Sequence, residues 1–137
     1  MSAQACIMVV DDDAMVRDII YDFLVSFGFS NILLVKDGEM AVRILRDPQK
    51  KVDLIISDWE MPKMNGLDIL KAVRSSAHRK NTKFIMVTSE RSQERMKITR
   101  AAQAQVDAYI IKPFREHTLK EKIDELLSQS KKADGAA

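Results

Sequence analysis

Five short runs of apolar residues recur along the chain, and most of them are continuous rather than alternating with polar residues. They are CIMVV (6–10), ILLV (32–35), DLIIS (53–57), KFIMV (83–87) and AYIIK (108–112). Continuous runs rich in Ile and Val are typical of strands that are covered on both faces. The runs therefore predict five strands of a parallel sheet.

The segments between these runs carry apolar residues at helical spacing. One apolar stripe is formed by Val16, Ile19, Ile20, Phe23, Leu24 and Phe27. Gly28 then stands where a helix usually ends. The same spacing recurs at Ala41, Ile44 and Leu45, at Leu67, Leu70 and Val73, and at Leu119, Ile123, Leu126 and Leu127. Residues 92–104 have helical propensity but only a thin apolar face, so this helix is expected to be weakly anchored.

Strands that alternate with helices indicate an α/β protein with helices on both faces of the sheet. Right-handed crossovers limit the topologies, and five strands suit the flavodoxin-like, doubly wound order 2-1-3-4-5 with five flanking helices. We expect one domain over residues 4–130, followed by a flexible tail over 131–137.

Composition excludes several classes of protein. The chain has 137 residues, which favours one domain, and its net charge of +2 is too small to indicate a nucleic-acid partner. No apolar run approaches the roughly 18 residues of a membrane helix, and the start MSAQAC does not resemble a signal peptide. The single cysteine, Cys6, allows no internal disulfide, which agrees with a cytoplasmic location.

Polar residues follow the predicted strands at one edge of the sheet. Asp11 and Asp12 follow the first strand, Asp58 the third and Thr88 the fourth, while Lys112 closes the fifth. In the order 2-1-3-4-5, the first and third strands are neighbours at the point where the strand order reverses, which is where such folds bind ligands. The side chains of Asp11, Asp12 and Asp58 should therefore meet.

Three carboxylates in one pocket are costly unless a cation neutralises them or some stay protonated. A hard divalent cation with oxygen ligands meets this need, and Mg²⁺ is the common choice. Lys112 and the Thr88 hydroxyl would face the same space, and a metal ion, a lysine and a hydroxyl around a carboxylate are typical of phosphoryl transfer. Asp58 could then be the nucleophile that forms an aspartyl phosphate. Asp13 is expected to be a helix N-cap.

Four stretches carry a resemblance to a known family. IMVVDDDAMVRDII, DLIISDWEMPKMNGLDILKAVR, FIMVTSE and AYIIKPF resemble the receiver domains of two-component response regulators, and the match runs from about residue 5 to residue 128. Stand-alone receivers of the chemotaxis type are the most similar members. The resemblance implies that Asp58 is the phosphoacceptor, that Asp12 binds Mg²⁺ directly with Asp11 beside it, and that the backbone carbonyl of Glu60 completes the metal site.

The resemblance also assigns a switch. Thr88 and Lys112 match the groups that hold the phosphoryl oxygens, and Tyr109 matches an aromatic side chain that turns inward when the Thr88 loop closes. Pro113 matches a proline that typically follows a cis peptide bond. Gln105 and Ala108 stand where glycine is common, and Gln105 is expected at a helix C′ position that prefers φ > 0. Trp59 is expected to be partly exposed.

The implied function is that of a signalling protein rather than a classical enzyme, although it catalyses its own phosphorylation and dephosphorylation. A histidine kinase or phosphotransfer protein would be the donor. The output would be a protein partner that reads the face formed by the helix at 92–104, the strand at 108–112 and the last helix. We also expect a cytoplasmic monomer with no nucleic-acid partner and no membrane span.

Other functions are open at this point. A receiver without an output domain could serve as a phosphate sink, as a phosphorelay intermediate or as a piece of a larger regulator. A haloacid-dehalogenase-type phosphatase is a remote alternative, because Asp11 and Asp13 have its D-x-D spacing, with Thr88 and Lys112 as further motifs. That family needs an acidic pair after the lysine, which KPFREHTLKEKIDELL does not supply at a strand end, and it would give Asp58 no role.

Overall fold

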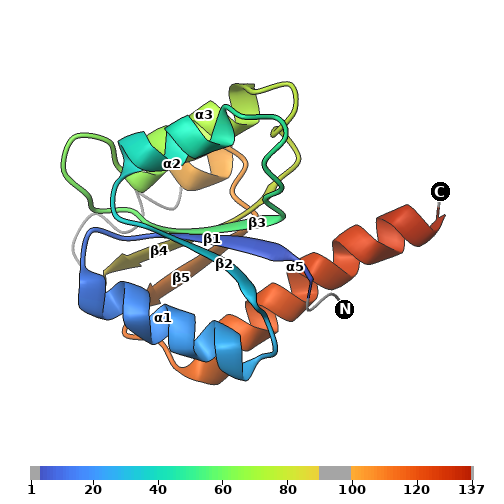
Figure 1. Cartoon of the computed structure of the whole chain (residues 1–137), viewed down its shortest axis with the longest axis horizontal. Helices are drawn as coiled ribbons and strands as arrows, with labels where there is room; N and C mark the ends of the chain where they lie inside the picture. Colours follow the sequence, from blue (N-terminus) through green and yellow to red (C-terminus); the bar gives the residue numbers. More distant parts are fainter. Residues whose placement is uncertain (1–3, 90–99, 137) are drawn as a thin grey trace.

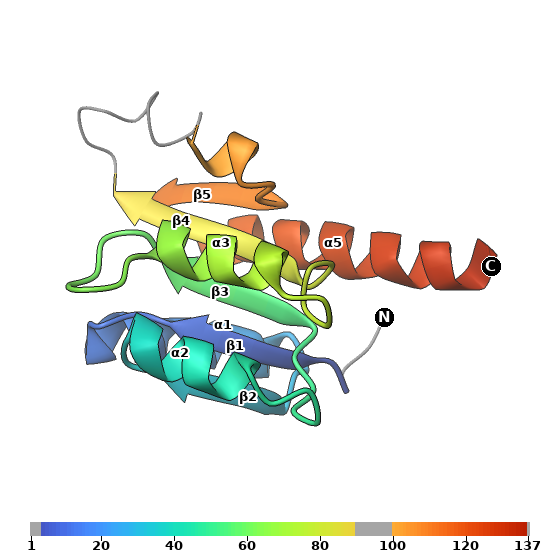
Figure 2. The same ribbon diagram turned by 90° about the horizontal axis from the view of Figure 1, so that it is seen from above.

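The sheet has the predicted strands and the predicted order. A computed structural model describes residues 4–89 and 100–136. Its strands are β1 (Cys6–Val10), β2 (Asn31–Val35), β3 (Leu54–Asp58), β4 (Lys83–Ser89) and β5 (Ala108–Lys112). All neighbouring strands are parallel, in the order β2-β1-β3-β4-β5 (Figure 2). This confirms the flavodoxin-like topology.

Helices cover both faces of the sheet. They are α1 (Ala14–Ser26), α2 (Gly38–Leu45), α3 (Gly66–Ser75) and α5 (Glu116–Ala136). α2 and α3 lie on one face, and α1 and α5 on the other (Figure 1). Most of the helix expected at 92–104 lies outside the described residues. Within the described part of this segment, residues 100–103 are helical. The doubly wound arrangement is therefore confirmed.

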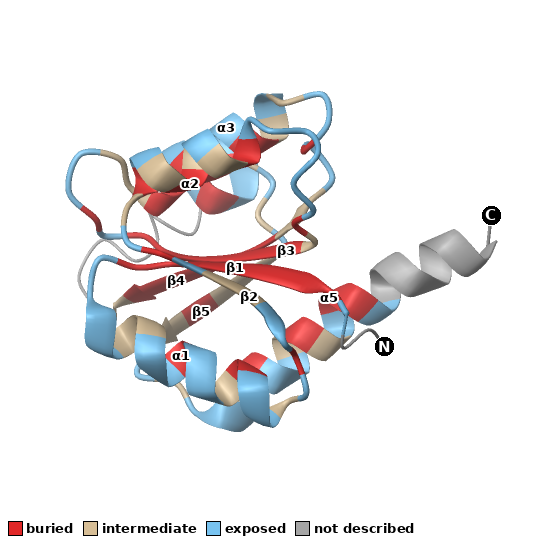
Figure 3. Ribbon diagram, in the orientation of Figure 1, coloured by how far each residue is buried: buried red, intermediate tan, exposed pale blue. Residues whose placement is uncertain are grey.

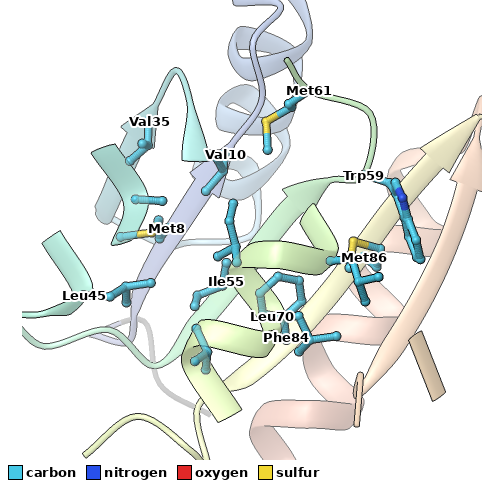
Figure 4. Close-up of a cluster of buried hydrophobic side chains, with 14 of the residues drawn as sticks. Met8, Val10, Val35, Leu45, Ile55, Trp59, Met61, Leu70, Phe84 and Met86 are labelled. Atoms are coloured by element: carbon cyan, nitrogen blue, oxygen red, sulfur yellow. The ribbon is translucent and has the colours of Figure 1, made fainter. Parts of the chain in front are cut away.

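The core consists of two hydrophobic layers, one on each side of the sheet. Met8 and Val10 of β1 pack in the layer beneath α2 and α3, together with Ile55 (Figure 4). Ile7 and Val9 point the other way and pack beneath α1 and α5. β1 and β3, at the centre of the sheet, are buried along their whole length (Figure 3). Full burial of each such side chain contributes about 1.5–3 kcal/mol, which explains why the strand sequences are continuously apolar.

Short polar side chains start the helices next to the carboxyl ends of the strands. Asp13 accepts a hydrogen bond from the Met15 backbone N–H, as the sequence predicted, and Asp37 caps α2 in the same way. Asn65 and Asp68 form a capping box at the start of α3. Such caps satisfy backbone N–H groups that have no partner within the helix. They fix where each strand-to-helix loop turns at the edge of the sheet.

Some details differ from the sequence-based expectations. Ile19, at the margin of the α1 stripe, is 45% exposed, whereas Trp59 is buried at 6% exposure. The backbone is helical through Ala136, while the domain over 4–130 and the flexible tail over 131–137 stay predictions. Gln105 has φ 67°, as expected. Among the described helices, none combines the length and the apolar character needed to cross a membrane.

Candidate functional site

The first acidic residues lie where β1 ends. Asp11 is 2% exposed, and its carboxylate Oδ1 accepts a hydrogen bond from the Asp13 N–H at 2.9 Å. Its backbone carbonyl accepts a hydrogen bond from the Arg17 guanidinium at 2.7 Å. Asp12, the next residue, is exposed. The loop after β1 therefore holds one carboxylate inside the fold and one at its surface.

Asp58 is the last residue of β3 and is 5% exposed. One carboxylate oxygen from each of Asp11, Asp12 and Asp58 lies within 4.8 Å of the others. The register explains this meeting, because β1 and β3 are parallel neighbours and Val10 pairs with Ser57, the residue before Asp58. The predicted convergence of the three carboxylates is therefore present.

Gly66 is a site-supporting residue that the sequence analysis did not identify. A Cβ atom at this position would lie 2.4 Å from the Asp58 carbonyl oxygen and 2.7 Å from the Met86 sulfur. The Gly66 N–H also donates a hydrogen bond to the carbonyl of Trp59 at 3.0 Å. Only glycine lets the start of α3 approach the backbone of Asp58 this closely. The available signal was a glycine directly after the N-cap residue Asn65.

Lys112, the last residue of β5, reaches across the end of β4 into the acidic cluster. Its Nζ lies 3.0 Å from Asp58 Oδ1 and 3.6 Å from Asp11 Oδ2. The lysine side chain is 27% exposed, while the two carboxylates are buried. The peptide bond between Lys112 and Pro113 is cis, as the sequence resemblance implied. One ammonium group thus serves two buried carboxylates.

The electrostatics show a surplus of negative charge. Burial raises the pKa of Asp58 to about 6, with the charge of Asp11 acting in the same direction and Lys112 opposing it. Burial also raises the pKa of Asp11. Burial alone would lower the pKa of Lys112, but the nearby carboxylates of Asp58, Asp11 and Glu60 raise it. Hard oxygen donors with uncompensated negative charge are the ligand chemistry that Mg²⁺ prefers, so the cluster fits this ion.

The other predicted site residues lie beside this cluster. Thr88 is fully buried near the end of β4, and its hydroxyl donates a hydrogen bond to Glu60 Oε1 at 2.6 Å. Tyr109 packs edge-on against Trp59, with ring centroids 6.5 Å apart. The sequence analysis gave Glu60 a role through its backbone carbonyl and missed the contact of its side chain with Thr88. The metal-binding role of that carbonyl and the switch role of Tyr109 stay predictions.

The arrangement argues against the dehalogenase alternative. That reading uses Asp11 and Asp13 as its acidic pair and leaves Asp58 without a role. In the structure, Asp58 belongs to the carboxylate cluster, whereas Oδ1 of Asp13 accepts a hydrogen bond from the Met15 N–H at 2.9 Å as an N-cap. The geometry therefore selects Asp11, Asp12 and Asp58 as the acidic set.

Comparison with known proteins agrees with this geometry. The family model of the response regulator receiver domain matches residues 7–124. The chain is 38% identical to chemotaxis protein CheY-3 of Vibrio cholerae, over 90% of this chain and 92% of that protein. It is also 38% identical to chemotaxis protein CheY of Pseudomonas aeruginosa, over 90% of this chain and 96% of that protein.

A solved structure gives the same result. The structure of Vibrio cholerae chemotaxis protein CheY4 superposes with a TM-score of 0.78 at 29% identity, covering 90% of this chain and 98% of that one. The family match spans the β1 end, the β3 end and β5, which supply the acidic cluster and its lysine. This chain belongs to the family of response regulator receiver domains.

Proposed function

We propose that this chain is a phosphorylation-dependent signalling protein in which Asp58 accepts a phosphoryl group. The observation that carries the proposal is the meeting of three carboxylates within 4.8 Å, with the Lys112 ammonium 3.0 Å from Asp58. Receiver domains generally bind Mg²⁺ in their acidic pocket. Here Asp11, Asp12, Asp58 and the backbone carbonyl of Glu60 would hold the ion.

The donor would be a phosphohistidine on a histidine kinase or phosphotransfer protein. A carboxylate oxygen of Asp58 attacks the phosphorus atom in line, so an O–P bond forms while the N–P bond to the imidazole breaks. The imidazole nitrogen keeps the electron pair of the broken bond and is later protonated. Lys112 stays beside the new acyl phosphate and neutralises charge on its oxygens. Bound Mg²⁺ would supply Lewis-acid stabilisation of the same oxygens.

The phosphoryl group adds negative charge and acceptor oxygens at the end of β3. Thr88, the next-to-last residue of β4, and Lys112, the last residue of β5, are the donors that would hold such a group. Tyr109 lies on β5, which pairs with β4, and it contacts Trp59. A shift of the β4 backbone near Thr88 would therefore also displace this aromatic pair. The surface formed around β5 and α5 would then change for a protein partner.

The relatives support a chemotaxis-type output, because the proteins at 38% identity are named chemotaxis proteins. The proposal includes a cytoplasmic location and a monomeric state. It also includes catalysis by the chain of its own phosphorylation and dephosphorylation, with no nucleic-acid partner.

Labelling with a small phosphodonor tests this proposal. The wild-type protein should incorporate ³²P from acetyl phosphate with Mg²⁺, and chelation of the metal should stop incorporation. Asp58→Asn should abolish labelling, because the amide is not a competent nucleophile. Asp13→Asn is the matched control, since it removes a nearby carboxylate while asparagine still caps α1, and it should label normally. Labelling of Asp58→Asn at the wild-type level would contradict the proposal.

A further inference from the structure

The side chain of Glu60 contacts the switch residue of the site. Glu60 follows Asp58 by two positions and is itself exposed. Its Oε1 accepts the hydrogen bond from the Thr88 hydroxyl at 2.6 Å and lies 3.5 Å from the Ser89 hydroxyl. A distance of 2.6 Å is typical of a charge-assisted O–H···O⁻ bond, which is stronger than a bond between neutral groups.

This bond competes with the proposed signalling contact. A threonine hydroxyl carries one proton, so it donates to one acceptor at a time. Thr88 cannot donate to Glu60 and to a phosphoryl oxygen on Asp58 simultaneously. Phosphorylation must therefore break the Thr88–Glu60 hydrogen bond before Thr88 can engage the phosphoryl group.

We propose that Glu60 is a positioning residue that holds the Thr88 hydroxyl in the unphosphorylated protein and thereby opposes the switch until Asp58 is phosphorylated. This inference rests on the proposed function and deepens it. Glu60 acts through Thr88 by means of its carboxylate, independently of any role of its backbone carbonyl at the metal. Part of the favourable free energy of the contact between Thr88 and the phosphoryl group offsets the loss of the Thr88–Glu60 hydrogen bond.

The release has a physical cause. A phosphoryl group brings additional negative charge next to the Glu60 carboxylate, whose field already reaches Asp58 and Lys112. Like charges repel, so phosphorylation weakens the hold of Glu60 while it offers Thr88 a new anionic acceptor. Because Glu60 is exposed, water can solvate its carboxylate once Thr88 has left. The buried threonine changes its acceptor, and the exposed glutamate turns to solvent.

A double-mutant cycle measures the effect of this hydrogen bond. The probe is beryllofluoride, a phosphoryl mimic, and its dissociation constant is measured by calorimetry at saturating Mg²⁺. Glu60→Ala and Glu60→Gln are each combined with Thr88 and with Thr88→Val, an isosteric change that removes the hydroxyl. Both Glu60 variants lose the same charge, so a difference between them is not a charge effect. Thr88→Ala serves as a second background if Thr88→Val unfolds.

With Thr88 present, Glu60→Ala should tighten beryllofluoride binding by about tenfold more than it does in the Thr88→Val background, since a hydrogen bond to a charged group contributes about 1.5 kcal/mol or more. Glu60→Gln should lie between wild type and Glu60→Ala with Thr88 present, and should equal Glu60→Ala without it. An equal effect of Glu60→Ala in both backgrounds would overturn the inference and leave the proposed function intact. Failure of the wild type to bind beryllofluoride would overturn both.

Discussion

The two edges of the sheet use charged residues in opposite ways. At the carboxyl edge, where β1, β3 and β5 end, the carboxylates of Asp11, Asp12 and Asp58 cluster, and Lys112 pairs with two of them, Asp11 and Asp58. At the amino edge, where β4 and β5 begin, Arg74 pairs with Asp107 at 2.8 Å. One edge has surplus negative charge, and the other has matched charges.

The amino edge satisfies its donors and acceptors with protein groups. Arg74 donates hydrogen bonds to the carbonyls of Gln105, Lys80 and Thr82, and Asp107 also accepts one from the Phe84 N–H. A second arginine also donates to backbone carbonyls. Arg79 is 5% exposed and donates hydrogen bonds to the carbonyls of Leu45, Asp47 and Lys50.

The difference teaches how to separate stability from function in this fold. Removing one partner of a matched, hydrogen-bonded pair destabilises the folded chain, because the other charge is left uncompensated. Buried charges that already lack full compensation cost stability and create a site for a cation or phosphoryl group. Substitutions at the amino edge should therefore lower stability and spare chemistry. Substitutions of the acidic residues at the carboxyl edge should impair phosphorylation without lowering stability.

The largest stability effect is expected at Arg74. Arg74→Ala removes four hydrogen bonds and leaves the Asp107 carboxylate without its cation, so the free energy of unfolding should fall by about 2–4 kcal/mol. Urea unfolding measures the loss. Arg43→Ala, at an exposed position of α2, is the control and should change stability by less than about 0.5 kcal/mol. Loss of Asp58 labelling in folded Arg74→Ala would break the separation of the two edges.

At the carboxyl edge, the sign of the pH dependence is a second test. The folded-state pKa of Asp58 is about 6, above the ordinary value of 3.8, so the folded chain binds more protons between these values. In metal-free buffer, the free energy of unfolding should therefore fall as pH rises from about 4 to about 6, by about 1–3 kcal/mol. Asp58→Asn should remove most of this fall, as measured by urea unfolding across the range. An identical slope in both proteins would contradict the raised pKa of Asp58.

Binding of Mg²⁺ to the acidic cluster should raise the free energy of unfolding, because the ion neutralises the carboxylates. At a concentration ten times its dissociation constant, Mg²⁺ should raise the free energy of unfolding by about 1.4 kcal/mol at neutral pH, because it binds only the folded chain. Trp59, buried next to Asp58, offers a fluorescence readout of the binding constant. Arg74→Ala should gain the same increment, whereas Asp12→Asn should gain much less. An equal gain in Asp12→Asn would place the ion elsewhere.

The smallest effect is expected at Gln105, whose φ of 67° is unfavourable for a residue with a side chain. Gln105→Gly relieves this conformation but makes the unfolded chain more flexible, so a net gain of only about 0.5 kcal/mol is expected from urea unfolding. Gln105→Ala keeps the unfavourable φ and should give no gain. A clear loss in Gln105→Gly would show that the side chain itself stabilises the amino edge.

The sequence predicted the carboxyl edge far better than the amino edge, for a physical reason. The carboxyl ends of neighbouring parallel strands lie side by side. Once β1 and β3 are predicted to be neighbours, Asp11 and Asp58 are therefore predicted to be close together. Arg74 and Arg79 instead bond to backbone carbonyls from distant loops, and carbonyls carry no sequence signature. The burial of Trp59 also depends on tertiary packing, against Tyr109, that no local pattern shows.

A crystal structure with Mg²⁺ and beryllofluoride tests the central claim most directly. We expect the beryllium atom bonded to a carboxylate oxygen of Asp58, and the metal ion in contact with Asp12 and Asp58. Lys112 and the Thr88 hydroxyl should contact the fluorine atoms. Beryllofluoride bonded to another residue, or a metal ion that leaves Asp12 and Asp58 uncoordinated, would contradict the account.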